Sequence, residues 1–180
     1  MSHPRRSFHS MFAIMLMSVF LVSCGGGVET SRQYCPTQGV LADTERLVGL
    51  SGDVIWSAQI SGTVLECHWD AQDRRLVTGL TMNGNVTSTS EADFATKLTL
   101  PAFVIMTGPS DTILVKKEFD VEISTSKELQ TVSFSKDVGS LTLTLAADDQ
   151  IEGHAILVGF RLTPDQLRAN RNYRTRKLGL

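Results

Sequence analysis

The sequence predicts a mainly β fold: an antiparallel β-sandwich of immunoglobulin-like architecture with a short C-terminal helix. Three observations predict it. Apolar and polar residues alternate with a period of two through most of residues 53–162. Turn-forming Gly, Pro and Asn interrupt that alternation at short intervals. No helical pattern separates the predicted strands, as it would in a fold with a parallel sheet. A small β-barrel is the alternative architecture.

Length and composition agree with one ordinary globular domain. The chain has 180 residues, of which 42% are hydrophobic and 20% charged, and its formal net charge is -2. These values exclude a disordered tail, a collagen-like fibre and a polytopic membrane protein. The charge balance gives no general reason to expect nucleic acid as a partner.

Residues 1–23 have the layout of a secretory signal peptide. A basic start with Arg5 and Arg6 precedes an apolar run from Met11 to Val22, which is followed by the small residue Ser23. That run is shorter than the roughly 20 residues that a transmembrane helix needs. We therefore expect the segment to be removed rather than to remain as a membrane span.

The end of this segment, Leu21-Val22-Ser23-Cys24, resembles the lipobox of bacterial lipoproteins. The resemblance implies that Cys24 becomes the mature N-terminus and carries a diacylglycerol on its thiol and a third acyl chain on its amino group. Several acyl chains give a durable anchor, whereas a single chain gives a reversible one. The alternative is an ordinary signal peptide cleaved nearby, which would leave Cys24 as a free thiol.

Residue 25 bears on the destination of such a lipoprotein. In bacterial lipoproteins an Asp at this position is the signal for retention in the inner membrane. Residue 25 is Gly, so we expect an outer-membrane lipid anchor that faces the periplasm. Residues 24–33, in which three glycines follow Cys24, are predicted to be a flexible tether. At roughly 3.5 Å per residue, that tether spans up to about 35 Å.

The other two cysteines, Cys35 and Cys67, would then lie in a compartment that permits disulfides, and we predict that they are bonded. The chain-entropy model gives such a bridge roughly 3 to 4 kcal/mol of stabilisation. It would pin the segment after the tether onto the sheet. Two buried free thiols are the alternative.

The predicted β domain spans residues 34–163 and begins with a hairpin. Alternation runs over residues 54–61, and it resumes after Gly62 over residues 63–70, with Cys67 on the core face. The next strand, residues 76–82, is predicted to end in the turn pair Asn83-Gly84. The polar stretch 85–97 is expected to be a loop.

The remaining strands follow the same pattern. Residues 98–106 precede a Gly108-Pro109 turn, and residues 113–123 form a long strand whose apolar face is broken by Lys117. Three further segments complete roughly eight strands: residues 132–134, 141–145 and 156–162. Thr163-Pro164-Asp165-Gln166 combines an N-cap, a Pro at the first helical position and a capping box. It predicts a helix from Pro164 to about Asn172, with Leu167 packing inward, before a basic tail that ends at residue 180.

Several segments together resemble an uncharacterised family of small alphaproteobacterial outer-membrane lipoproteins. They are Cys35-Pro36, Cys67, residues 113–119 and the motif LVGFRLTPDQLRANR at residues 157–171. The resemblance covers about residues 34–173. It implies an envelope location and a β-rich domain, but no activity and no catalytic residue.

Motifs of catalysis are missing from the sequence, so we expect neither an enzyme nor a cofactor. There is no G-x-S-x-G, H-E-x-x-H or P-loop spacing. Cys67 could act as a nucleophile beside His68 only as a free thiol, which the predicted bridge removes. His154, between Gly153 and Ala155, is expected at the surface rather than as a ligand.

Glu66, His68 and Asp70 occupy alternate positions of one predicted strand, so their side chains project from the same face. They could approach a metal ion together. Any solvated sheet face shows the same pattern, however, and we favour that interpretation and predict no metal site.

Charge is distributed unevenly along the chain. Residues 161–180 hold six basic residues and one acid, a net +5, whereas residues 24–160 hold nine basic and 18 acidic residues, a net -9. The basic end could dock on phospholipid head groups, peptidoglycan carboxylates or an acidic protein face. The candidate docking residues are Arg168, Arg171, Arg174, Arg176 and Lys177. The alternative is a solvated helix whose arginines pair with the acidic body.

Two functions follow from these expectations. The first is a non-catalytic interaction module that supports an envelope assembly through an exposed edge strand or the basic C-terminal segment. The alternative is a binding module for a small ligand, a lipid or peptidoglycan. A continuous sandwich core would favour the first, and an apolar cavity of several hundred Å3 the second. The sequence identifies neither the partner nor the oligomeric state, and nucleic acid is not expected in the periplasm.

Overall fold

The computed structural model describes residues 35–51, 54–88, 97–125, 130–146 and 151–179. The chain divides into two units, residues 1–30 and 31–180, and every described residue belongs to the second. The predicted signal peptide, the lipidation site at Cys24 and the tether lie outside the described residues. No helix in the described part of the chain is both long and apolar enough to cross a membrane.

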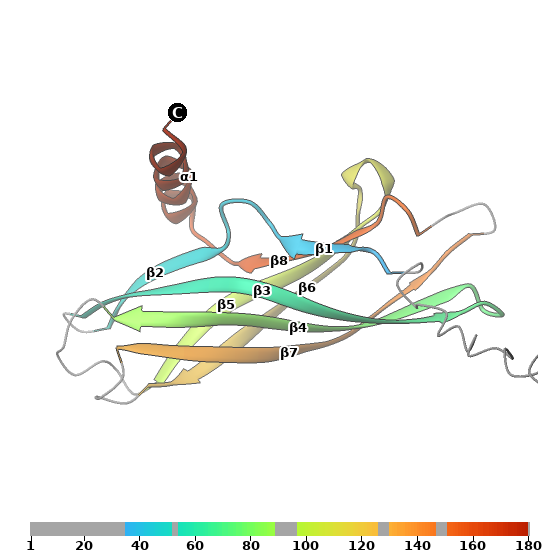
Figure 1. Cartoon of the computed structure of the whole chain (residues 1–180), viewed down its shortest axis with the longest axis horizontal. Helices are drawn as coiled ribbons and strands as arrows, with labels where there is room; N and C mark the ends of the chain where they lie inside the picture. The colour runs from blue at the N-terminus through green and yellow to red at the C-terminus, as the bar shows by residue number, and fades with distance from the viewer. Residues whose placement is uncertain (1–34, 52–53, 89–96, 126–129, 147–150, 180) are drawn as a thin grey trace, which may run out of the picture. The chain divides into compact units, whose positions relative to one another are not determined.

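The described residues form two four-stranded sheets (Figure 1). The first sheet has the order β1 (Thr37–Val40), β8 (Ala155–Phe160), β5 (Lys97–Thr107) and β6 (Ile113–Ser124). The second sheet has the order β2 (Arg46–Ser51), β3 (Val54–Asp70), β4 (Arg75–Ser88) and β7 (Thr131–Thr144). All neighbours are antiparallel except β1 and β8. The predicted β-sandwich is confirmed, and the alternative of a closed barrel is not.

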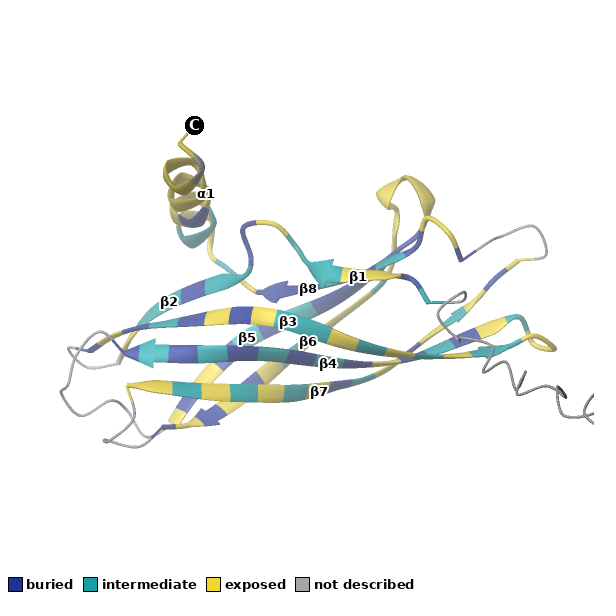
Figure 2. Cartoon of the chain, in the orientation of Figure 1, coloured by how far each residue is buried: buried dark blue, intermediate teal, exposed yellow. Residues whose placement is uncertain are grey.

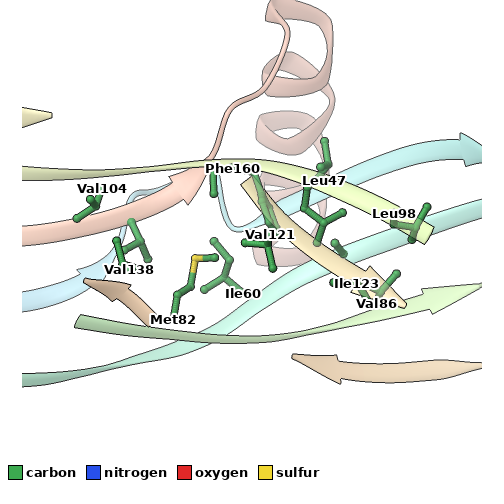
Figure 3. Packing of buried hydrophobic residues seen from close by; sticks show 14 of the residues in the cluster. Leu47, Ile60, Met82, Val86, Leu98, Val104, Val121, Ile123, Val138 and Phe160 are labelled. Atoms are coloured by element: carbon green, nitrogen blue, oxygen red, sulfur yellow. The ribbon is translucent and has the colours of Figure 1, made fainter. Parts of the chain in front are cut away.

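The core lies between the sheets and is built by the alternation that predicts the strands. Figure 2 shows buried and more exposed positions alternating along β4 and β5. One cluster of buried apolar side chains draws on both sheets. Figure 3 shows members from the first sheet and from the second: Leu98, Val104, Val121, Ile123 and Phe160, and Leu47, Ile60, Met82, Val86 and Val138.

The predicted hairpin at Gly62 is wrong, because β3 runs through this residue without a turn. Its register against β4 shifts between Ile60 and Gly62, which places one extra residue, Ser61, in β3. Before this bulge the even-numbered residues are buried, and after it the inward positions are odd-numbered, as at Leu65. In the sequence, the apolar positions likewise change from even-numbered to odd-numbered at this point. Such a change indicates a β-bulge as readily as it indicates a turn.

The predicted turn at Asn83-Gly84 is also wrong, since both residues lie inside β4. A Cβ atom on Gly84 would lie 2.4 Å from the Gln59 carbonyl oxygen and 2.4 Å from Cζ of Phe134 on β7. Glycine is therefore present for close packing and not for a turn. The predicted loop over residues 85–97 is wrong at its start, because residues 85–88 belong to β4. Residues 89–96 lie outside the described residues.

The turn between β3 and β4 is closed by Asp70, whose Oδ1 accepts the backbone N–H groups of Gln72 (3.0 Å) and Asp73 (3.2 Å). This side-chain turn needs no glycine, because Arg74 takes the positive φ of 47° itself. A turn of this kind is harder to recognise in a sequence than an Asn-Gly pair is.

Residues 132–134 and 141–145, predicted as separate strands, belong to a continuous β7 as far as Thr144. A bulge at Val138 joins them, and Gly139 follows with φ +85°. Lys117 of β6 donates a hydrogen bond from Nζ to the Val138 carbonyl, at 2.7 Å. The lysine that interrupts the apolar face of β6 thus satisfies a carbonyl group that the bulge releases from the ladder.

Helix α1 (Pro164–Leu178) begins as predicted, with the Thr163 N-cap and both hydrogen bonds of the capping box. It does not end near Asn172. Residues 173–178, predicted as part of the tail, remain helical until Gly179, which has φ +70° and donates its N–H to the last turn. Since Arg, Lys and Leu are good helix formers, glycine is the first stop signal.

The predicted disulfide between Cys35 and Cys67 is confirmed, with a Cα–Cα distance of 5.7 Å across 32 positions of sequence. It joins the residues just before β1 to the far part of β3. Half-buried Cys67 packs against a second, smaller apolar cluster of Leu76, Leu145 and Ile151. The bridge thereby stabilises an end of the domain that the main core does not reach.

Candidate functional site

Helix α1 stands beside the edge strand β2 (Figure 1) and makes side-chain hydrogen bonds to its backbone. Because Glu45, Leu47 and Gly49 face β3 in the ladder, the carbonyl groups of Arg46 and Val48 point away from it. The Gln166 amide donates to Val48 O at 3.2 Å, and the Asn170 amide donates to Arg46 O at 2.7 Å. Two amides four residues apart on one helix face therefore bind two of the carbonyl groups on the free edge of β2.

Asp43, in the connection between β1 and β2, anchors the same helix. It has φ +67°, and its side chain is only 7% exposed. Its carbonyl accepts a second hydrogen bond from Asn170 at 2.9 Å. Its carboxylate pairs with Arg171 (Nε–Oδ2, 3.5 Å) and Arg174 (Nε–Oδ1, 3.0 Å). The expected pairing of C-terminal arginines with the acidic body is confirmed at these two positions.

Asn170→Ala is expected to lower the free energy of unfolding by about 1 to 3 kcal/mol, because it leaves the carbonyls of Asp43 and Arg46 without their amide donor. Hydrogen exchange of the α1 amides should accelerate in the variant. The matched control is Asn172→Ala, which alters an exposed asparagine of the same helix and should change stability by less than about 0.5 kcal/mol. Equal effects of the two substitutions would contradict the assigned contact.

A cleft of about 320 Å3 lies between the second half of α1 and the start of β2 and β3. We call it the α1 groove. Its charged lining consists of Glu45, Arg46, Arg174 and Lys177. The rest of the lining is made by Gln59, Asn170 and Tyr173. Three cations against one carboxylate make the groove electropositive.

The cations differ in how they are held. The Arg46 guanidinium lies 4.9 Å from the centroid of the Tyr173 ring, a cation–π contact that orients it. Arg174 uses its Nε atom for Asp43. Lys177 and Glu45 take part in no ion pair with any described residue, although both line the same cleft.

The structure divides the five predicted docking residues. Arg174 and Lys177 meet in the α1 groove. The other three do not line it. Arg168 pairs with Asp165 on the exposed side of the helix, and Arg171 pairs with Asp43. Arg176 donates a hydrogen bond from Nε to the Asn172 carbonyl at 3.3 Å. Sequence reasoning missed the partners from outside the tail, above all Arg46 and Glu45. The helical spacing of Gln166, Asn170, Arg174 and Lys177 was a usable signal for the contacting face.

The other side chains considered for chemistry lie elsewhere. Glu66 and His68 are exposed, and Asp70 serves the β3–β4 turn and pairs with Arg75 at 3.7 Å. Within the described ranges, no group of three potential metal ligands comes together.

The expectation that His154 lies at the surface is wrong, because it is only 5% exposed. Its backbone N–H and its ring Nδ1 both lie 3.1 Å from the Ile151 carbonyl, in a tight turn through Gly153 at φ +86°. The turn folds the imidazole back into the wall of a second cleft, of about 350 Å3, beside Leu114 and Leu143.

Arg161, the first of the basic C-terminal residues, pairs with the acidic outer face of β6. Its guanidinium contacts Glu118 at 2.9 Å and Asp120 at 3.4 Å, and Lys116 also contacts Glu118 at 2.8 Å. The pKa of Glu118 lies below its ordinary value of 4.5. The main cause is the hydrogen bond and positive charge of Lys116, and Arg161 makes a smaller contribution of the same kind.

A pH titration should register this arrangement. Because the folded pKa is lowered, the contribution of Glu118 is present above its ordinary pKa and is lost as the pH falls through the folded pKa. We expect Lys116→Met to raise the pKa of Glu118 toward the ordinary value, and to raise it more than Arg161→Met does. Carboxyl chemical shifts followed by NMR would measure both, and an unchanged pKa in both variants would contradict the assignment.

Fold and site together describe a β-sandwich with a basic groove between its C-terminal helix and an edge strand. The sequence matches no protein-family model, and no curated protein matches it. The resemblance to small alphaproteobacterial lipoproteins therefore stays a prediction.

Proposed function

We propose that the protein is a lipid-anchored outer-membrane lipoprotein that faces the periplasm and acts as a non-catalytic interaction module of the cell envelope. The α1 groove is its contact site. The observation that carries this proposal is the meeting of Arg46, Arg174 and Lys177 in one cleft. A domain that is otherwise acidic keeps these cations together, and Lys177 has no acidic partner among the described residues.

The sheet edges favour the groove over an edge strand as the contact site. The exposed face of β6 carries Lys116, Glu118, Asp120 and Glu122, and β7 has a bulge at Val138. Charges and bulges discourage the addition of a strand. Two carbonyl groups on the free edge of β2 are bound by α1, and β1 is only 4 residues long. Docking by β-augmentation, the other route that the sequence left open, is therefore less favoured.

The core favours an interaction module over an internal ligand-binding site. Its main cluster of apolar side chains joins both sheets and includes residues with no exposed surface, such as Leu100, Val104 and Phe160. A tightly packed interior of this kind leaves the surface for recognition.

Mass spectrometry of the N-terminal peptide from the native host tests the anchor. We expect a mature chain that begins at Cys24 with a diacylglycerol and an amide-linked acyl chain, recovered in the outer-membrane fraction. Cys24→Ala should abolish the lipid and release or mislocalise the protein, whereas Cys35→Ala should keep the lipid. An unmodified Cys24, or a chain cleaved elsewhere, would refute this part of the proposal.

A further inference from the structure

The α1 groove contains unpaired charge of both signs. Lys177 on α1 and Glu45 before β2 both line the cleft, yet they lie too far apart to pair with each other, and the described residues offer neither of them another ionic partner. Arg174 is held through Nε by Asp43, and no described residue accepts a hydrogen bond from its Nη atoms. A ligand could therefore meet hydrogen-bond donors and an acceptor within one cleft.

The three cations of the groove are suited to a phosphate group. Arg46 is oriented by the Tyr173 ring and Arg174 by Asp43, so both guanidinium groups are partly fixed before a ligand arrives. Guanidinium groups bind phosphate oxygens in bidentate geometry, and a lysine adds a mobile point charge.

Glu45 adds a second requirement for the ligand. Glu45 is half-buried, and its carboxylate would be repelled by a simple anion but attracted by an ammonium group. The cleft, at about 320 Å3, is close to the lower limit of roughly 300 Å3 for small-molecule sites, so it suits a small ligand. These constraints describe a small zwitterion.

We infer that the α1 groove binds a phosphoethanolamine group, with its phosphate against Arg46, Arg174 and Lys177 and its primary ammonium against Glu45. The group is the head of a common class of phospholipid and also occurs as a free phosphomonoester. This inference rests on the proposed function in that it names the chemistry recognised at the same groove.

Calorimetric titration of the full chain in a neutral detergent tests the assignment. The probes are O-phosphoethanolamine, O-phosphocholine, inorganic phosphate and dihexanoylphosphatidylethanolamine below its micellar concentration. Phosphoethanolamine is expected to bind several-fold more tightly than phosphocholine, whose quaternary ammonium has no N–H to donate to Glu45. Tighter binding of the short-chain lipid than of the free head group identifies a lipid as the source, and equal binding identifies the head group alone.

Two substitutions separate binding of the phosphate from binding of the ammonium group. Lys177→Gln should weaken every phosphate-bearing probe by about tenfold, the lower end of the usual effect of losing one hydrogen bond to a charged group. Glu45→Gln should weaken phosphoethanolamine but leave inorganic phosphate unchanged or more tightly bound. Matched controls are Arg168→Gln on the exposed side of α1 and Glu122→Gln on β6, neither of which should alter any affinity.

No binding of any probe, or equal binding of phosphoethanolamine and phosphocholine with no effect of Glu45→Gln, would overturn the inference. The titration uses isolated protein and does not depend on its location. Failure of the envelope role and failure of the ligand assignment are therefore separate results.

Discussion

Replacing Cys35 and Cys67 together by serine is expected to lower the free energy of unfolding by about 3 to 4 kcal/mol, the loop-closure entropy of a bridge across 32 positions. For a domain of this size the midpoint of thermal unfolding should fall by about 10 °C. Urea unfolding monitored by tryptophan fluorescence measures the first quantity, and calorimetry the second.

The same substitution should have a local signature. β1 has only 4 residues, and its pairing with β8 is held near its start by the bridge. Amide exchange in β1 should therefore accelerate more than exchange in β5, at the centre of the first sheet. Cys24→Ser is the matched control and should leave unfolding unchanged. A loss of less than about 1 kcal/mol in the double variant would contradict a stabilising role of the bridge.

Gly84→Val should destabilise the domain by about 3 kcal/mol, because the new side chain would overlap the Gln59 carbonyl and the Phe134 ring. Since one of these neighbours is backbone, the site cannot relax by a simple change of rotamer. Chemical denaturation measures the loss, and NMR spectra should show displaced signals for Phe134.

Gly79→Val is the control within the same strand. The Cβ position at Gly79 is 3.9 Å from the nearest side-chain atom, and the residue is exposed. Valine there should be neutral or stabilising by up to about 1 kcal/mol, because it suits a strand better than glycine does. If both valine variants lost the same stability, strand conformation rather than packing would explain the glycine at position 84.

These two glycines show where sequence reasoning on the fold succeeds and where it fails. Period-two alternation locates the long strands and predicts the sandwich, because burial on one face of a sheet acts directly on each residue. Asn83-Gly84 has the composition of a turn, but the choice of Gly84 is dictated by Phe134, which is distant in sequence. Local pattern cannot report a non-local contact of this kind.

The helix illustrates the same division. Its start is encoded within four consecutive residues, Thr163 to Gln166, and was predictable. Its docking on the edge of β2 depends on hydrogen bonds that join residues 118 to 127 positions apart, which composition does not reveal. For that reason the excess of basic residues was visible in the sequence, whereas the groove formed with Arg46 and Glu45 was not.

Site-specific photocrosslinking in intact cells tests the contact site most directly. A photoreactive amino acid at Gln59, an exposed residue of the α1 groove, should capture a discrete envelope component. Arg46→Gln combined with Lys177→Gln should abolish that adduct, and the same probe at Ser133, exposed on the edge strand β7, should give none. Adducts that form at Ser133 alone, or that persist at Gln59 without the two cations, would contradict the assignment of the α1 groove as the contact site.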